Sequence, residues 1–554
     1  MHDSRIAAIS QKNHRGSWLT GLLIFSMLAT EVRAEAAAGL PSARELASAG
    51  AVIGDIRIVR QNVFDLSIPE ENNALYRLAN RLHMQTRESV IRQQLLFKPG
   101  EVYSERLVDE SERLLRRNIY LYDARIRPVR YVGGVVDLEV TTRDVWTLMP
   151  GFSVSRKGGE NRTRFSISEN NLLGSGARVK LAYIDDVDRE STSFEYADNN
   201  LGESWTALQV FVADNSDGDS QLLRLVRPFF ALDSRWSGGL EVFDSDSETR
   251  FYELGEEVAE YRESSRYLNG FGGVSSGLKN GWVRRYTAGV TIDEHRFLNT
   301  TDQMLPQLLP ADRELVYPWL GVELIEDRFE TSSNRDQIDR TEDFYLGQRL
   351  AARLGYAGST LGSDRDALMF NVAASRGFGD MGKKALLLRS SVDGRVEHGS
   401  LVNALWHVNA RYYRQTSEKH LAFMTLSASI GRNLDLDNPL MLGGDNGLRG
   451  YPLRYQIGDK RALLTLEYRY FTDWYPFRLV RVGGAVFADA GRTWGDNPAG
   501  GGSIGLLKDV GFGLRLVPTR ASGREVIHFD IAFPLDGDRS IDSVQILLES
   551  KTSF

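Results

Sequence analysis

The sequence predicts a membrane protein of the all-β class, with an antiparallel transmembrane β-barrel preceded by one small α+β domain. Two observations predict this fold. Apolar and polar side chains alternate along consecutive stretches of the carboxyl-terminal half, as they do in strands with two different faces. Residues 51–143 instead have the spacing of two helices placed between strands. The hydrophobic content of 42% fits a barrel too, since a barrel needs apolar residues only at alternate positions.

The amino terminus is expected to be a secretory signal peptide, residues 1–34. An apolar run at residues 18–29 follows several basic residues and precedes Val32-Arg33-Ala34, a small-residue pattern typical of a cleavage site. The run is too short for a helix that spans a bilayer, although a membrane anchor is the alternative interpretation. Residues 35–50 are mostly small and polar, and they are expected to form a flexible leader.

The composition excludes several classes of site. The chain has no cysteine, which excludes disulfides, thiol catalysis and cysteine metal sites. Its net charge of −7 is mild for 554 residues and gives no basis for nucleic-acid binding. The sequence contains no H-E-x-x-H, H-x-x-E-H, G-x-S-x-G or Walker motif, and residues 214–219 resemble a calcium loop only faintly. We therefore expect no enzyme activity, no cofactor and no metal site.

Residues 51–143 are expected to fold as strand, helix, helix, strand, strand. The first helix is expected to open at Ser67 and the second to be capped by Ser104, because serine accepts hydrogen bonds from the first turn of a helix. Two strands at residues 124–130 and 135–140 follow, joined by a Gly-Gly turn. This order makes a small α+β domain ahead of the barrel.

Residues 144–554 are expected to form the barrel, and the alternation is clearest in its last five stretches. Along the final one, apolar Ile546 and Leu548 alternate with polar residues such as Glu549, and Phe554 falls on the apolar parity. A soluble sandwich would also alternate. Consecutive strands with charges on the enclosed face, however, favour an apolar exterior around a wet lumen. The other four stretches are residues 462–470, 480–489, 509–516 and 527–533.

The sharpest local signal is a glycine-rich loop at residues 441–455, with the sequence MLGGDNGLRGYPLRY. A loop of this length needs an internal tie, and Arg449 is the candidate. Its guanidinium can bind a carboxylate through two parallel hydrogen bonds and keeps its charge. Glu467 and Asp489 fall on the polar parity of the strands that follow, which is the lumen side. On residue type alone, an exposed surface arginine is the alternative.

Three phrases near the amino terminus, FKPGEVYS, ERLLRRNIYLYDA and VDLEVTTRDVW, resemble a POTRA domain. POTRA domains stand in the periplasm before the barrel in the BamA/TamA-type family of outer-membrane assembly and secretion proteins, also called the bacterial surface antigen family. The phrase ENNLLGSG at residues 169–176 resembles the second strand of that family and the turn after it. One POTRA domain, at residues 51–143, fits this chain.

The stretch LRGY at residues 448–451 resembles the signature at the tip of the family's sixth extracellular loop, which folds back into the barrel. The resemblance implies that Arg449 contacts the carboxylate of an aromatic-x-Asp-x-Gly strand motif, here centred on Asp489, with Glu467 as a second carboxylate. Phe554 resembles the terminal aromatic by which outer-membrane barrels are recognised for assembly. Further residues of these motifs are Gly447, Leu448, Gly450 and Tyr451 in the loop, and Phe487, Gly491, Gly511 and Gly513 in the strands. The last two glycines lie on the polar parity and are expected to leave room for the inserted loop.

The sequence pattern and the family resemblance give different numbers of barrel strands. About twenty runs after residue 144 have strand-like alternation, and an even number is expected. The resemblance implies sixteen strands, and we expect sixteen, with the remaining runs forming long extracellular hairpins. The barrel is expected to close between a first strand near residues 146–156 and a last strand at residues 543–554.

The resemblance also implies a function and a location. It places the barrel in the bacterial outer membrane, with the POTRA domain in the periplasm, and implies that the protein inserts other β-barrels or translocates polypeptides. The expected partners are the outer-membrane lipid bilayer with its lipopolysaccharide and unfolded outer-membrane or secreted polypeptides. A periplasmic or inner-membrane accessory protein is a further candidate, and nucleic acid is not. Two alternatives stay open: a dedicated transporter of the two-partner type for one secreted protein, and a passive pore or structural surface protein.

Overall fold

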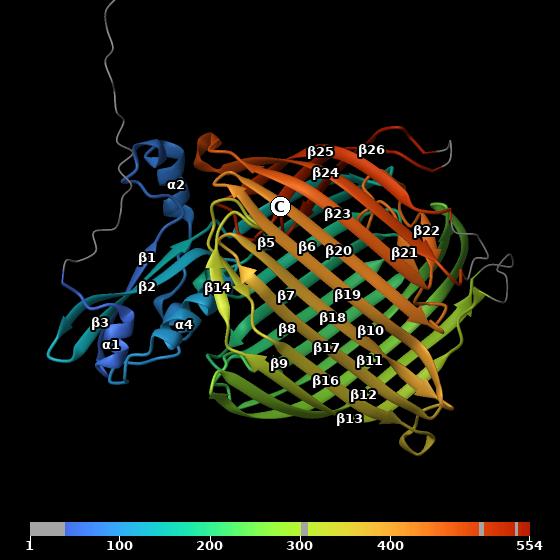
Figure 1. Ribbon diagram of the computed structural model, residues 1–554, viewed down its shortest axis with the longest axis horizontal. Coiled ribbons are helices and arrows are strands. Elements are labelled where there is room, and N and C mark those ends of the chain that lie inside the picture. Colours follow the sequence, from blue (N-terminus) through green and yellow to red (C-terminus); the bar gives the residue numbers. More distant parts are fainter. Residues whose placement is uncertain (1–38, 301–307, 498–503, 538–540) are drawn as a thin grey trace, which may run out of the picture.

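The computed structural model describes residues 39–300, 308–497, 504–537 and 541–554. The expected signal peptide and residues 35–38 of the expected leader lie outside the described residues. The expectation of a flexible leader is wrong for residues 43–48, which form helix α1 with Leu46 buried in the core of the N-terminal domain. Figure 1 shows a large barrel with a smaller domain at one end. Among the described residues, the helices are all too short or too polar to cross a bilayer.

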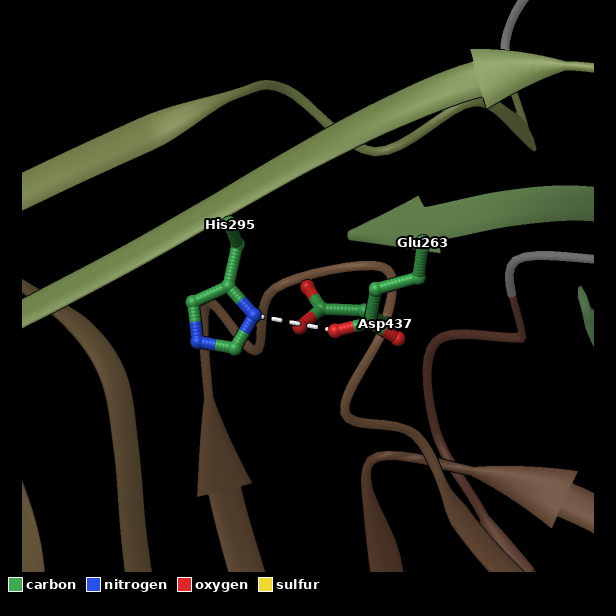
Figure 2. A group of neighbouring side chains, drawn as sticks. All are labelled: Glu263, His295 and Asp437. Atoms are coloured by element: carbon green, nitrogen blue, oxygen red, sulfur yellow. Dashed lines mark hydrogen bonds and ion pairs between the residues drawn. The ribbon is translucent and has the colours of Figure 1, made fainter. Parts of the chain in front are cut away.

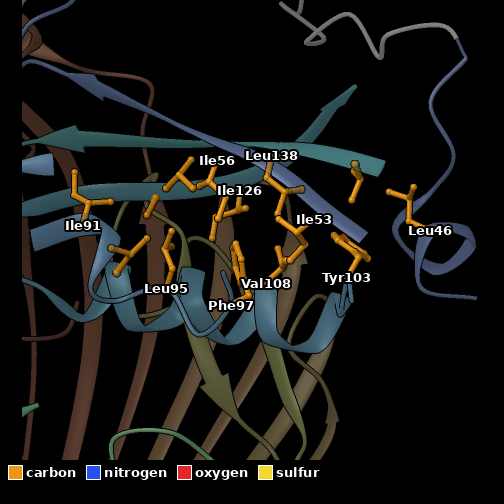
Figure 3. Close-up of a cluster of buried hydrophobic side chains, with 14 of the residues drawn as sticks. Leu46, Ile53, Ile56, Ile91, Leu95, Phe97, Tyr103, Val108, Ile126 and Leu138 are labelled. Carbon is orange, nitrogen blue, oxygen red and sulfur yellow. The ribbon is translucent and has the colours of Figure 1, made fainter. Parts of the chain in front are cut away.

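The N-terminal domain, residues 43–144, is a three-stranded sheet with helices on one face (Figure 3). Strand β3 lies in the middle, parallel to β1 and antiparallel to β2, and α4 packs its apolar side against the sheet. The elements are α1 (Ala43–Ser48), β1 (Val52–Gln61), η1 (Pro69–Glu71), α2 (Ala74–Leu82), α3 (Glu88–Arg92), α4 (Glu105–Arg117), β2 (Leu121–Val132) and β3 (Val135–Asp144). Its core includes Leu46, Ile53, Ile91, Val108, Leu115, Ile126 and Leu138.

The two expected helix starts fared differently. Ser104 caps α4, because its hydroxyl accepts a hydrogen bond from the backbone N–H of Leu107. Ser67 does not open a helix, and its hydroxyl donates instead to Asp65 at 2.6 Å. Helix α2 begins seven residues later, where Asn73 accepts from the N–H of Tyr76 at 2.9 Å. Asparagine is as good a cap as serine, so the wrong one of two capping residues was chosen.

The barrel is closed and contains twenty strands, each paired with its sequence neighbours in the wall. The expectation of sixteen strands is wrong. The additional runs, including the long strands β10 to β12, pair into the wall along their length instead of standing apart as extracellular hairpins. The wall strands are β4 (Leu148–Lys157), β5 (Glu160–Glu169), β6 (Arg178–Asp185), β7 (Glu190–Leu201), β8 (Thr206–Asn215), β9 (Gly218–Arg227), β10 (Trp236–Glu253), β11 (Glu256–Lys279), β12 (Trp282–Asn299), β13 (Arg313–Glu326), β16 (Arg349–Ala357), β17 (Ala367–Asp380), β18 (Lys384–Glu397), β19 (Ser400–Ser417), β20 (His420–Arg432), β23 (Lys460–Phe471), β24 (Val480–Trp494), β25 (Leu507–Pro518), β26 (Val526–Pro534) and β27 (Gln545–Lys551). Short helical turns are η2 (Leu172–Gly174), η4 (Ser359–Leu361) and η5 (Pro476–Arg478).

Within the part of the chain that the structure describes, two hairpins leave the wall, and their strands pair with each other. Strands β14 (Phe329–Ser332) and β15 (Glu342–Tyr345) follow β13, and β21 (Leu440–Leu442) and β22 (Gln456–Gly458) follow β20. Because neighbouring strands alternate in direction from β4, the first hairpin starts at the end that carries the N-terminal domain and the second at the far end. Figure 1 shows β14 beside α4, with β21 and β22 toward the opposite end.

The outside of the wall is apolar and its inside is polar. On β25, Phe512 and Leu514 are half exposed, whereas Asp509 and Arg515 on the alternate positions are buried. The same alternation runs along β23, where Leu466 is exposed and Glu467 is buried. An apolar exterior around a charged interior is the arrangement expected of a strand wall in contact with lipid.

The closing seam is the weakest part of the wall. Strands β27 and β4 share one paired position, Leu548 with Arg156. On the other side of β27, every residue of β26 from Val526 to Ala532 has a partner. Few ladder hydrogen bonds therefore hold the first and last strands together.

Phe554 does not lie on the outer face. Strand β27 ends at Lys551, the chain then turns inward, and the Phe554 ring is buried against Phe471 with ring centroids 4.8 Å apart. The backbone N–H of Phe554 donates to the carbonyl of Asp336 at 2.7 Å. The expected outer placement was wrong because parity predicts a face only while the strand continues.

We predict that Phe554→Ala lowers the thermal stability of the barrel refolded in detergent. Truncating a buried phenylalanine typically costs about 3–5 kcal/mol of unfolding free energy. The matched control is Thr552→Ala, since Thr552 is exposed beside it. Melting should be followed by loss of the compact band on gels. Equal melting temperatures for the two variants would show that the terminal ring is not a packing element.

Candidate functional site

The far-end loop between β20 and β23, residues 433–459, folds into the barrel. Its tip is fully buried: Leu448 and Tyr451 have no exposed surface and Arg449 is 4% exposed. Leu448 and Tyr451 pack with Leu442 and with Leu507 of β25, so the apolar part of the loop is fixed against the wall. The Tyr451 hydroxyl donates to the carbonyl of Lys508 at 2.7 Å. This hydrogen bond adds a second tie between the loop tip and β25.

Arg449 lies between carboxylates of three wall strands. Its Nε and Nη2 donate to the two oxygens of Asp489 on β24, at 2.7 and 3.0 Å. Its Nη1 donates to Glu467 Oε1 on β23 at 3.0 Å and lies 3.6 Å from Asp530 on β26. The guanidinium also stacks on the Phe487 ring, with its carbon 3.4 Å from the ring centroid. The structure thus brings Arg449 together with both carboxylates chosen from the sequence.

Asp530 was missed as a member of this group. The alternation along residues 527–533 predicts the polar parity for Asp530, but the motifs of the family resemblance include no residue at this position. Parity alone could have found it. Arg515 on β25 binds Asp530, and Arg469 on β23 donates to Glu467 Oε2 at 2.9 Å. Three buried guanidinium groups therefore meet three buried carboxylates.

The motif glycines give space to this cluster. A side-chain carbon on Gly511 would collide with the Phe487 ring, and one on Gly513 would collide with Asp530. A side-chain carbon on Gly450 would lie 2.8 Å from Asp509, whose carboxylate accepts from the Gly450 N–H at 3.1 Å. The expectation that Gly511 and Gly513 make room for the loop itself needs correction. The space is taken by the wall groups that hold Arg449.

The remaining motif glycines support the loop backbone. Gly447 has φ +125°, a conformation that side chains disfavour, and a side-chain carbon there would collide with Leu463. A side-chain carbon on Gly491 would lie 2.8 Å from Leu442 of the loop. Both positions therefore need glycine for the loop to pack as closely as it does.

A polar cavity of about 510 Å³ lies elsewhere in the lumen, between the wall from β12 to β19 and the loop after β20. Beside it, Glu263, His295 and Asp437 come close enough to share a metal ion (Figure 2). These groups already have partners. His295 Nδ1 lies 2.9 Å from Glu263 Oε1, its Nε2 lies 3.1 Å from Asp293, and Arg313 binds Asp437 through two hydrogen bonds. The arrangement is a satisfied ion-pair network, and we assign no metal to it.

Comparisons with known proteins gave matches among solved structures only. No family model matches the chain, and no curated protein matches it. BamA from Haemophilus ducreyi lacking POTRA domains 1–3 has 13% sequence identity and a TM-score of 0.38, over 90% of this chain and 85% of that chain. CdiB from Acinetobacter baumannii has 14% identity and a TM-score of 0.44, over 91% of this chain and 74% of that chain. CdiB from Escherichia coli has 13% identity and a TM-score of 0.45, over 90% and 76%. The twenty-strand barrel described above rests on its own strand pairing and not on these similarities.

We predict that Arg449→Ala releases the loop without unfolding the barrel. Removing one member of a buried ion cluster typically costs about 3–5 kcal/mol, because the partner charges are stranded. Loop residues 442–455 should then become sensitive to protease in the purified protein. Arg449→Lys keeps the charge but loses the forked hydrogen bonds, so its protease sensitivity should lie between that of the unchanged protein and that of Arg449→Ala. A loop that stays equally resistant in Arg449→Ala would contradict the lock.

Proposed function

We propose that the chain is an outer-membrane protein that inserts other β-barrels into the membrane or passes polypeptides across it, with the N-terminal domain in the periplasm. One observation carries the proposal: the chain's own loop lies inside the barrel lumen, held by Arg449, while the wall closes at a seam with one paired position. The apolar exterior supports contact with lipid. A permanently open pore would need neither a lock nor a weak seam.

The proposed action needs no catalysis and no cofactor. An unfolded client can add a strand to an exposed sheet edge through backbone hydrogen bonds. The N-terminal sheet offers two edges, β1 and β2, and exposed Val129 and Val132 lie on β2. The second edge-like element is the seam between β27 and β4, where a client strand could pair as the wall opens. The bilayer with its lipopolysaccharide and unfolded polypeptides would be the partners, and an accessory periplasmic or inner-membrane protein could dock on the same domain.

A disulfide across the seam tests whether the wall must open. The chain has no cysteine, so a Leu548→Cys, Arg156→Cys pair at the paired position would be the only thiols present. We expect the oxidised protein to lose its ability to promote insertion of an unfolded outer-membrane barrel into liposomes, and reduction to restore it. The control is a Leu548→Cys, Phe529→Cys pair, which joins β27 to β26 where the wall is already fully paired. Full activity of the oxidised seam would exclude lateral opening.

Site-specific photo-crosslinking from Val129 on the exposed edge β2 separates the alternatives. Capture of several outer-membrane barrel proteins in cells would support an assembly role, and capture of one secreted protein would support a dedicated transporter. The control position is Lys98, an exposed residue in a turn outside the sheet. Equal, unspecific capture from both positions would favour a passive pore or structural protein.

A further inference from the structure

A second segment enters the barrel from the end that carries the N-terminal domain. Residues 327–348, which we name the mouth hairpin, leave the wall after β13, form β14 and β15, and return to β16. The tip between the two strands is buried: Arg335, Gln337 and Ile338 are at most 4% exposed. Glu342 accepts hydrogen bonds from three consecutive backbone N–H groups at the tip, those of residues 335–337. Burial, with the nearby Asp336 carboxylate, raises the pKa of Glu342 to about 8.

The mouth hairpin packs on the inner face of the wall from β18 to β26. Ile338, Phe344 and Leu346 form one apolar cluster with inward-facing residues of the strands from β18 to β26. Arg335 Nε donates to the carbonyl of Met381 at 2.6 Å, beyond the end of β17. The members of the cluster outside the hairpin are Met381, Ala385, Tyr413, Leu421, Phe423, Phe471, Ala485, Val517, Val526 and Phe554.

The same hairpin holds the carboxyl terminus. Gln337 Nε2 donates to the carbonyls of Thr552 and Arg524, both at 2.9 Å. The carbonyl of Asp336 accepts from the N–H of Phe554, whose ring lies in the apolar cluster. The end of the seam strand β27 is therefore tied to the hairpin as well as to β26.

The N-terminal domain holds the outer side of the hairpin. Arg116 at the end of α4 forms a forked pair with Asp343, at 2.9 and 2.7 Å, and Arg116 is 5% exposed. The Tyr122 hydroxyl on β2 donates to the carbonyl of Asp339 at 2.9 Å. Arg113 stacks on the Phe329 ring at 4.2 Å from its centroid. The edge strand β2 and helix α4 thus both contact the hairpin.

The hairpin also reaches the cluster that locks the far-end loop. Arg469 donates through Nη1 to the carbonyl of Arg335 at 2.8 Å and lies 3.7 Å from the Asp336 carboxylate. The same guanidinium donates to Glu467, which binds Arg449. One arginine therefore joins the segment that enters from the domain end to the segment that enters from the far end.

We propose that the mouth hairpin is an internal gate. It closes the lumen at the domain end, clamps the end of the seam strand, and is held shut by the N-terminal domain through the Arg116–Asp343 pair. Movement of the N-terminal domain relative to the barrel would pull on Asp343. The hairpin tip would then leave the wall and release the end of β27. The inference extends the proposed function, but the gate is a property of the isolated protein and is tested without any client.

Thiol accessibility measures the gate directly. Ala385 lies in the apolar cluster, is 1% exposed and faces the lumen from β18. Because the chain has no cysteine, Ala385→Cys would introduce its only thiol. The gate is removed by replacing residues 327–347 with Asn-Gly. The ends Glu326 and Gln348 are already hydrogen-bonded at 2.9 Å, as a two-residue turn requires. Labelling by a water-soluble maleimide should then speed up by more than about tenfold, since the rate follows the exposed population. An unchanged rate would overturn the gate.

Control by the N-terminal domain is tested with two matched carboxamide variants. Asp343→Asn weakens the Arg116 pair, whereas Glu70→Gln weakens a pair between the N-terminal domain and Arg478 of η5 on the wall. We expect Asp343→Asn to raise the labelling rate of Ala385→Cys and Glu70→Gln to leave it unchanged. Equal rates in the two variants would exclude control through Asp343. This arm also decides the matter if the shortened hairpin fails to give a heat-resistant barrel, because it keeps the whole chain.

Single-channel conductance gives an independent readout of the two closures. Arg449→Ala alone should remain closed, since the mouth hairpin still blocks the domain end. Arg449→Ala combined with the shortened hairpin should conduct. A large conductance of Arg449→Ala with the native hairpin would contradict the gate and leave the proposed function standing, whereas a client never captured would leave the gate standing.

Discussion

The buried charge cluster around Arg449 constrains the rest of the structure. Three guanidinium groups and three carboxylates from a loop and four neighbouring strands can be buried together only if every charge has a partner, since a single unpaired charge costs several kcal/mol. The register of β23 to β26 must therefore be correct to the residue. A slip of one position in β23 or β24 would turn Glu467 or Asp489 outward, and a slip in β25 or β26 would do the same to Arg515 or Asp530. The position of the loop in the lumen and the register of the wall strands therefore depend on each other.

This cluster also explains how parts far apart in the sequence share one response. Arg469 binds both Glu467 and the backbone of Arg335, so the loop lock and the mouth hairpin share one guanidinium. The hairpin in turn contacts α4 and the carboxyl terminus. The N-terminal domain, the seam strand and the far-end loop are connected through direct contacts and need no long-range pathway.

Sequence reasoning reached the lock and missed the gate for identifiable reasons. Alternation fixes which face a strand residue occupies, so Glu467 and Asp489 could be placed in the lumen before the fold was known. Alternation gives about twenty strand-like runs after residue 144 but does not say whether each run joins the wall, and the expectation of sixteen strands came from the family resemblance. The runs at residues 329–332 and 342–345 look like any short strands. The side chains that the hairpin packs against lie on β18 to β26, and local sequence patterns do not reveal such contacts. Phe554 was misplaced for a related reason, because its contact with Asp336 is non-local.

The most direct measurement of the central claim is a double-mutant cycle between Arg449 and Asp489, using Arg449→Ala, Asp489→Ala and the combined variant. The readout is the opening free energy of the loop, taken from hydrogen exchange at the Gly450 amide, which donates to Asp509. The account predicts a coupling energy above about 1 kcal/mol, since the two side chains form a buried forked pair. Additive effects, with a coupling near zero, would contradict it.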